Sequence, residues 1–368
     1  MQVEDSPYAP GAGHMPIVLV AREAQLNRWL GMLTAVESRG RQRAEDTIIV
    51  GPRGVGKTVL LQVMSDQARA MGYQVIGMQA ARGTGGLMRY LLREIRRRAQ
   101  TEAPFRSAWQ RLQSVSLGAF GINVAVGRST EPAPDVADLT AMDLADGLAT
   151  LASELRKDHD RGGLLLTIDE MQVAERFDLA LLAATLGRLN TDHPDARVIF
   201  AGAGLLNVRQ TLRDAGVTHP DRLFRLAELP ARFTRDETVT AIVSTTMHLD
   251  AYWDPDAVEA IYQVTGGYPA HVQLYADAAW RTAKGPRITL AEATAAIGQT
   301  SSEVALSTLG PDWDELTDRQ REYAAALAVL GGEARTRDVA QVLDQPPGAV
   351  SRTDGGLVRK GFCYHPSR

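Results

Sequence analysis

Eight consecutive residues have the composition and spacing of a phosphate-binding loop. Residues 51–58 read Gly-Pro-Arg-Gly-Val-Gly-Lys-Thr and match the pattern G-x-x-x-x-G-K-S/T. Glycines let successive backbone amides turn toward phosphate oxygens, and a helix that begins at the loop adds the positive end of its dipole. A β-rich run, 47–50, precedes the loop and an amphipathic stretch, 57–71, follows it. This context favours a nucleotide site over a glycine-rich turn with a surface lysine.

The side chains of this loop have distinct expected roles. Lys57 is placed to reach the β- and γ-phosphates, and the Thr58 hydroxyl is placed to ligate Mg²⁺. The loop residues predicted to contact the nucleotide are Gly51, Pro52, Arg53, Gly54, Val55, Gly56, Lys57, Thr58 and Val59.

Two carboxylates follow a second apolar run, Leu-Leu-Leu-Thr-Ile at 164–168. Asp169 is expected to hold the same Mg²⁺ ion, and Glu170 is expected to orient or deprotonate the attacking water. An apolar strand that ends in acidic residues is common, so a solvated strand end is the alternative. The phosphate loop and the carboxylates are the two halves of one mechanism, hydrolysis of ATP to ADP and phosphate, and they occur along the chain in the expected order. The pair is typical of ATP-hydrolysing P-loop proteins, so ATP and Mg²⁺ are the predicted ligands.

The elements around these residues alternate between short β-rich runs and amphipathic helices. This alternation predicts a parallel sheet covered by helices. The expected strands are 47–50, 74–79, 164–168, 198–201 and 224–226, and the expected helices lie near 22–38, 57–71, 86–100, 138–158 and 178–190. Between the second and third strands, residues 113–126 alternate around glycines and are expected to form a hairpin, followed by a loop at 129–138.

After residue 230 the sequence predicts helices with strong start signals. Capping boxes occur at 234–237, 289–292 and 317–320, and Asp254 precedes a proline that suits the first helical position. A small helical unit is therefore expected over residues 231–300. The last segment is expected to form helices at 318–330 and 336–343 and a third helix after two prolines, 346 and 347.

Taken together, these motifs resemble AAA+ ATPases of the prokaryotic origin-recognition-like group, which carry a C-terminal winged helix. The resemblance spans about residues 16–365 and is carried by 16–23, 51–58, 168–172, 198–204, 221–225 and 265–269. It implies an α/β fold: a P-loop NTPase (AAA+) parallel-sheet domain, then a helical lid, then a C-terminal winged helix-turn-helix. The implied parts are a flexible tail at 1–15, the nucleotide-binding domain at 16–230, the lid at 231–311 and the winged helix at 312–368.

The resemblance also implies roles for residues outside the loop. Ile17 and Val18 would pack on the adenine base. Arg222 or Arg225 would be an arginine finger for the γ-phosphate of a neighbouring subunit, in an ATP-dependent homo-oligomer; plain surface charge is the alternative.

The chain departs from the family at two positions. The fourth strand ends in Ala-Gly-Ala-Gly at 201–204, where the family often has a polar residue, and Asn207 is the nearest polar side chain. His271 takes a lid position that often holds arginine, although a surface helical histidine is the plainer interpretation. Both departures predict slow hydrolysis.

Two basic segments are candidates for contact with nucleic acid. Residues 346–364 would place a third helix in duplex DNA, with a first wing strand formed by Phe362, Cys363 and Tyr364; winged helices also bind protein. The expected DNA contacts on that helix are Ser351, Arg352, Arg359 and Lys360. An earlier helix face carries Arg89, Arg93, Arg96 and Arg97, a pattern that is more often a solvated face.

Composition limits the remaining function classes. The net charge of −4 argues against binding of nucleic acid by the whole surface, and the single cysteine, Cys363, excludes an internal disulfide. No apolar run approaches the ~18 residues that a membrane helix needs, and the first residues lack the features of a signal peptide, so a cytoplasmic protein is expected. The sequence thus predicts a DNA-associated ATPase that acts as an ATP-dependent molecular switch. One alternative is a nucleotide-binding signalling or scaffold protein with little hydrolysis, whose winged helix contacts protein. Another is a helper ATPase for mobile-element or phage DNA.

Overall fold

The structure is a computed structural model that describes residues 6–80, 86–118, 139–157, 161–305, 313–360 and 362–363. Two compact units are present. One contains residues 22–51 and 57–229, and the other contains residues 1–21, 52–56 and 230–368. Within the described ranges, no helix is both long and apolar enough to cross a membrane.

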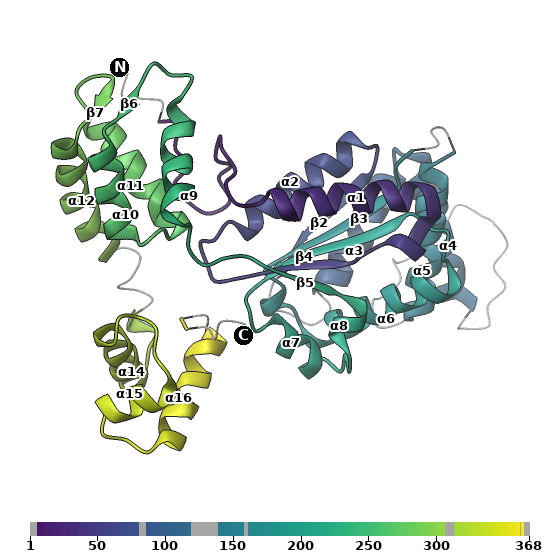
Figure 1. Ribbon diagram of the computed structural model, residues 1–368. Coiled ribbons are helices and arrows are strands. Elements are labelled where there is room, and N and C mark those ends of the chain that lie inside the picture. Colours follow the sequence, from purple (N-terminus) through teal and green to yellow (C-terminus); the bar gives the residue numbers. More distant parts are fainter. Residues whose placement is uncertain are drawn as a thin grey trace. The chain divides into compact units, whose positions relative to one another are not determined.

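The first unit is a five-stranded parallel sheet with helices on both faces (Figure 1). The strand order is β2-β3-β4-β1-β5. Its strands are β1 (Thr47–Val50), β2 (Gln74–Gln79), β3 (Leu164–Asp169), β4 (Val198–Gly204) and β5 (Arg225–Glu228). Its helices are α1 (Glu23–Arg39), η1 (Gly40–Arg43), α2 (Lys57–Ala70), α3 (Gly86–Ala99), α4 (Ala103–Gly118), α5 (Ala141–Leu155), η3 (Met171–Val173), α6 (Arg176–Asp192), α7 (Val208–Asp214) and α8 (Pro220–Leu223). The predicted parallel sheet is confirmed.

A buried ion pair fixes the start of the central strands. The Arg41 guanidinium donates to the Asp46 carboxylate at 2.7 Å and to the Val198 carbonyl at 2.9 Å. Asp46 also accepts the Phe200 amide at 2.9 Å. These bonds join the residue before β1 to the first half of β4, and the parallel pairing that follows places Val50 opposite Gly204.

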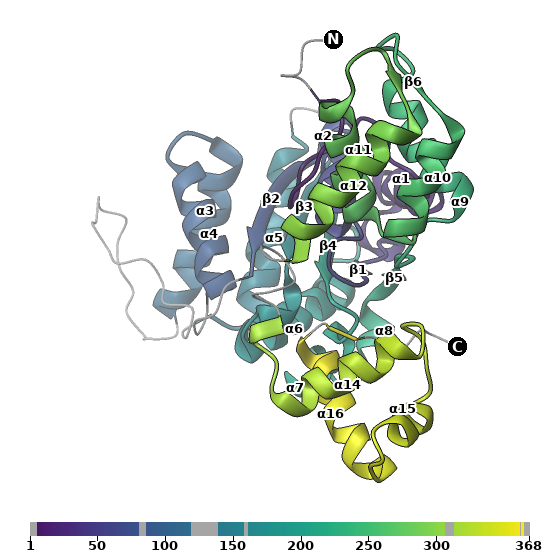
Figure 2. The ribbon, with the colours of Figure 1, turned by 90° about the vertical axis from the view of Figure 1, so that its left-hand side faces the viewer.

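The segment between β2 and β3 differs from the prediction. Residues 113–118, expected to begin a hairpin, are the last turns of α4, and 119–138 lie outside the described residues. Phe105, Trp109 and Leu112 are buried at helical spacing, which explains the helix. Figure 2 shows α3 and α4 side by side.

The second unit is mainly helical. Its elements are α9 (Arg235–Val239), η4 (Thr240–Ser244), β6 (Tyr252–Trp253), α10 (Pro255–Thr265), α11 (Pro269–Thr282), β7 (Arg287–Ile288), α12 (Leu290–Val304), α14 (Asp318–Val329), α15 (Thr336–Val342) and α16 (Pro347–Lys360). All three predicted capping boxes, at Thr234, Thr289 and Thr317, are confirmed. The helical expectation missed one short parallel pair, β6 with β7.

Pro7 and Tyr8 are buried in this second unit, so the expectation of a loose tail is wrong at these residues, whereas residues 11–15 are exposed. Tyr8 is only 5% exposed. Its hydroxyl donates to the Ile242 carbonyl at 2.8 Å, and its ring meets Trp253 and Trp280 edge to face. Apolar burial and this hydrogen bond hold the segment in place. Residues 1–5 lie outside the described residues.

The C-terminal helices α14, α15 and α16 share their own apolar cluster. The expected wing strand is not found at Phe362 and Cys363, and Tyr364 lies outside the described residues. The Phe362 amide instead donates to the Leu357 carbonyl at 3.0 Å, a hydrogen bond typical of a helix C-terminus. The side chains of Phe362 and Cys363 pack against the apolar cluster.

Candidate nucleotide and magnesium site

The phosphate loop joins β1 to α2, as its sequence predicts. Gly54 and Gly56 have positive φ values of 70° and 86°, which side chains rarely tolerate, so glycine is required at both. Lys57 is the first residue of α2 and is only 7% exposed. The loop therefore has the backbone path that directs a helix N-terminus and a lysine toward bound phosphate.

Residues 52–56 of this loop belong to the same compact unit as Tyr268. The Tyr268 hydroxyl donates to the Arg53 carbonyl at 2.7 Å. A Cβ atom on Gly54 would collide with that hydroxyl. Gly54 is thus needed both for its backbone conformation and for the approach of Tyr268.

The predicted metal ligands lie together. The Thr58 hydroxyl donates to the Asp169 carboxylate at 2.7 Å, which joins the first turn of α2 to the end of β3. Both groups offer the oxygen ligands that Mg²⁺ prefers, so these residues fit the ion. Within the described parts of the chain, no group of three or more His, Cys, Asp or Glu side chains could hold a metal ion. Phosphate oxygens and water would have to complete the coordination, as they do at typical Mg²⁺-nucleotide sites.

Glu170 follows Asp169 in a left-handed conformation, with φ 55° and ψ 40°. This conformation is costly for a residue with a side chain and re-aims the carboxylate after the strand ends. The Glu170 amide donates to the Asp169 carboxylate at 2.8 Å. The two carboxylates therefore have different positions, one beside Thr58 and one on the turn that follows.

Sequence reasoning missed Gln172. Its side-chain amide donates to the Glu170 carboxylate, and its side-chain oxygen accepts the Leu205 amide at 3.0 Å. The available signal was a polar residue two positions after the predicted catalytic carboxylate. That signal is weak without knowledge that the 171–173 turn faces the end of β4.

Comparisons with known proteins found family matches for two parts of the chain. Residues 18–200 match the family described as AAA ATPase domain, and residues 307–368 match a domain of unknown function, DUF8462. No curated protein sequence matches. The ORC2 protein of Aeropyrum pernix, solved as ADPNP–ADP complexes, is 17% identical to this chain and has a TM-score of 0.53. The alignment covers 98% of this chain and 89% of the ORC2 chain. The protein has the P-loop AAA+ fold.

Two further solved structures are similar. The RuvB Holliday junction branch migration motor of Thermotoga maritima has 14% identity, covers 94% of this chain and 90% of its own, and has a TM-score of 0.45. The ORC1 protein of Aeropyrum pernix in complex with DNA is 16% identical and has a TM-score of 0.44. The alignment covers 93% of this chain and 84% of the ORC1 chain. The AAA+ fold rests on the sheet, the family match and the ORC2 similarity.

The residues expected at the adenine base lie in the second unit. Val18 packs against its apolar cluster, whereas Ile17 is 63% exposed. His271, at the departing lid position, is half-buried and meets the rings of Tyr268 and Tyr275 edge to face. Burial lowers the pKa of His271, which favours its neutral form.

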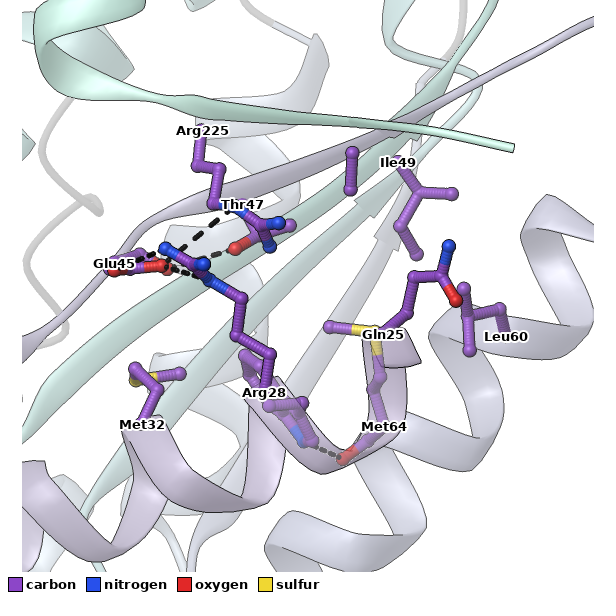
Figure 3. A pocket seen from close by; sticks show the side chains of 11 residues that line it. Gln25, Arg28, Met32, Glu45, Thr47, Ile49, Leu60, Met64 and Arg225 are labelled. Carbon is purple, nitrogen blue, oxygen red and sulfur yellow. Dashed lines mark hydrogen bonds and ion pairs between the residues drawn. The ribbon is translucent and has the colours of Figure 1, made fainter. Parts of the chain in front are cut away.

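The two arginine-finger candidates of the AAA+ domain have different surroundings. Arg222 is exposed on α8. Arg225 begins β5 beside a pocket, where its guanidinium and that of Arg28 both face Glu45 (Figure 3). The distance from Arg225 to the Glu45 carboxylate is 3.9 Å, and burial, with a smaller effect from Arg28, lowers the pKa of Arg225.

The expected DNA-contacting residues lie on α16, but one of them has an internal role. Ser351 and Arg352 are exposed. The Lys360 ammonium donates to the Glu315 carbonyl at 2.7 Å and to the Gln320 side chain at 3.1 Å. These bonds tie the end of α16 to the start of α14. The side chain of Arg359 lies outside the described residues.

Proposed function

We propose that this protein binds ATP with Mg²⁺, hydrolyses it slowly and acts as an ATP-dependent molecular switch associated with DNA. The observation that carries the proposal is the hydrogen bond between Thr58 and Asp169, next to Glu170 and Lys57. These residues supply the parts that phosphoryl transfer to water needs: a phosphate cradle, an ion site and a carboxylate for the attacking water.

The chemistry assigns one task to each side chain. Lys57 would bind the terminal phosphates, while Thr58 and Asp169 would hold Mg²⁺, which neutralises charge on the phosphate oxygens when bound. Glu170 would orient the attacking water and accept its proton. β4 ends at Gly204, which has no polar side chain to position the attacking water, and this supports slow turnover.

The switch proposal is supported by the contact of Tyr268 with Arg53 and Gly54. A phosphate held by this loop would change the surroundings of the Arg53 carbonyl, to which Tyr268 is bonded. Nucleotide binding would therefore alter a contact made by the start of α11. A ligand shifts an equilibrium between conformations only through such differential contacts.

Association with DNA is supported by the charge of α3 and α4. Residues 86–118 contain seven arginines and two glutamates, a net charge of +5 in a chain of −4. Arg89, Arg93, Arg96 and Arg97 are exposed, while Leu91, Leu92 and Ile95 are buried. A cluster of this kind neutralises phosphates without reading sequence.

The C-terminal helices favour the second candidate function, contact with protein. Residues 313–360 contain seven basic and eight acidic residues, and Lys360 bonds within the chain. If α16 contacts protein, DNA would be held by α3 and α4, or the chain would be a nucleotide-dependent signalling protein with little hydrolysis.

ATP turnover with Mg²⁺, measured with and without duplex DNA, tests the function. We expect slow turnover in the wild type and none in Lys57→Ala, with Lys284→Ala, an exposed lysine, as the matched control. Absence of ATP binding by wild-type protein would refute the nucleotide site.

DNA binding is measured by anisotropy over a salt series. Combined Arg89→Gln, Arg93→Gln and Arg96→Gln should lower the salt-dependence slope by about one for each lost phosphate contact. Arg352→Ala tests α16 in the same way. No duplex binding at low salt would refute the DNA association and favour the protein-contact function.

A further inference from the structure

Gln172 occupies the space between the carboxylate after β3 and the end of β4. Its Nε2 donates to Oε2 of Glu170, and its Oε1 accepts the Leu205 amide at 3.0 Å. The Leu205 amide is a donor only, so it fixes the oxygen of Gln172 toward β4 and the NH₂ group toward Glu170. The bridge therefore has one consistent orientation.

Small residues in β4 make room for this bridge. A Cβ atom on Gly202 would collide with the sulfur of Met171. A Cβ atom on Gly204 would lie 2.8 Å from Val208 and 3.2 Å from Oε1 of Gln172. β4 therefore has glycines where a polar side chain could stand, and these glycines leave the space that the turn with Gln172 occupies.

We propose that Gln172 is a positioning residue for ATP hydrolysis, which holds the Glu170 carboxylate against the backbone at the end of β4. This inference rests on the function proposed above. One carboxylate oxygen of Glu170 is fixed by the amide, and the other stays available for water. A glutamate side chain rotates about several bonds, so its carboxylate needs such a partner to keep one direction.

Loss of this positioning should affect the chemical step more than binding. Gln172→Leu keeps the approximate size and removes both hydrogen bonds. We expect kcat to fall roughly 10- to 100-fold, because small displacements of a reacting group have effects of this size, while KM changes less than about twofold. Gln210→Leu is the matched control, because Gln210 is exposed on α7, where its side-chain amide donates to Asp214 of the same helix.

Gln172→Glu separates positioning from a merely structural role. Its carboxylate can still accept the Leu205 amide but repels Glu170. We expect the Leu205 amide to keep its protection from hydrogen exchange in this variant while kcat falls. In Gln172→Leu the same amide should exchange faster. Full activity in Gln172→Glu would overturn the proposal.

A double-mutant comparison tests whether Gln172 acts through Glu170. In a Glu170→Gln background, Gln172→Leu should lower kcat less than about twofold further, because residues that act as a unit are not additive. Independent, multiplying losses would overturn the inference. Wild-type turnover that Glu170→Gln leaves unchanged would instead refute the proposed role of Glu170, so the two failures are distinguishable.

Discussion

The Thr58 hydroxyl and the Asp169 carboxylate are hydrogen-bonded at 2.7 Å, although 111 residues separate them in sequence. β1 and β3 are parallel strands on either side of β4, so the phosphate loop after β1 and the end of β3 lie at the same end of the sheet, where the strands' carboxyl ends meet. The hydroxyl oxygen and the carboxylate oxygen that this bond joins are the two atoms that would ligate Mg²⁺.

Removal of the hydroxyl should therefore weaken ATP binding only when Mg²⁺ is present. Thr58→Val keeps the shape of the side chain and removes the ion ligand. We expect ATP affinity measured by calorimetry to fall about tenfold or more with Mg²⁺ and to change little with EDTA. Thr34→Val is the control, because Thr34 lies on the exposed face of α1. Equal losses in both conditions would contradict a role for Thr58 in ion binding.

Tyr8 should contribute strongly to stability despite its position near the start of the chain. Its ring is buried against Trp253 and Trp280, and its hydroxyl bonds Ile242. Tyr8→Ala should lower the free energy of unfolding by about 3 kcal/mol, by analogy with large buried aromatic residues, and Tyr8→Phe by about 1 kcal/mol. Tryptophan fluorescence during denaturation measures both.

The matched control for this prediction is Tyr252→Ala, because Tyr252 is 67% exposed. An equally small effect of Tyr8→Ala and Tyr252→Ala would show that the N-terminal segment adds no stability.

Local signals in the sequence predicted most of the sheet. The strands at 47–50 and 74–79 have the predicted bounds, because each is a short β-rich run next to a loop or glycine. The three helix starts predicted from capping boxes are confirmed. In each, the Thr side chain accepts the backbone amide three residues later, and the Glu or Gln side chain there accepts the Thr amide. The fold class followed from these elements together with the phosphate loop.

Tertiary contacts explain what the sequence did not predict. The proline- and glycine-rich segment around Tyr8 has the composition of a loose tail, but its bond partner Ile242 is 234 residues away. Gln172 becomes informative only through Leu205, and Phe362 ends a helix through a bond to Leu357 rather than starting a strand. The local amino-acid composition does not indicate which distant residues will be such partners.

His271 should make stability depend on pH. Burial lowers its folded-state pKa below the ordinary value of about 6.5, so its stabilising contribution is present above that pH. The contribution is lost as pH falls through the folded-state pKa. The thermal unfolding temperature of the wild type should therefore fall more between pH 7.5 and pH 5 than that of His271→Phe. This variant keeps a ring between Tyr268 and Tyr275.

His219→Phe provides the control for this pH series, because His219 is exposed. Its unfolding temperature should follow that of wild type at each pH. Parallel curves for wild type and His271→Phe would contradict the stabilising role of neutral His271.

The two arginine-finger candidates, Arg222 and Arg225, make the predicted assembly testable. An arginine finger must reach a phosphate on another subunit, and it can be worth about 10³-fold or more in rate. Arg222 is exposed on α8, whereas Arg225 is half-buried beside Glu45 and Arg28. We therefore expect Arg222 to be the finger and Arg225 to support the fold. Specific activity of the wild type should rise with protein concentration, and Arg222→Ala should remove that rise without weakening ATP binding.

Mixing experiments decide whether the finger acts between subunits. Arg222→Ala protein keeps its own phosphate loop, and Lys57→Ala protein keeps its arginine, so a mixture should recover part of the activity that each lacks alone. Arg225→Ala should retain the concentration dependence and lose stability instead. Activity per subunit that is independent of concentration, with no recovery on mixing, would rule out a finger supplied by a neighbour. The protein would then be a monomeric ATP switch, because hydrolysis would depend only on residues of its own chain.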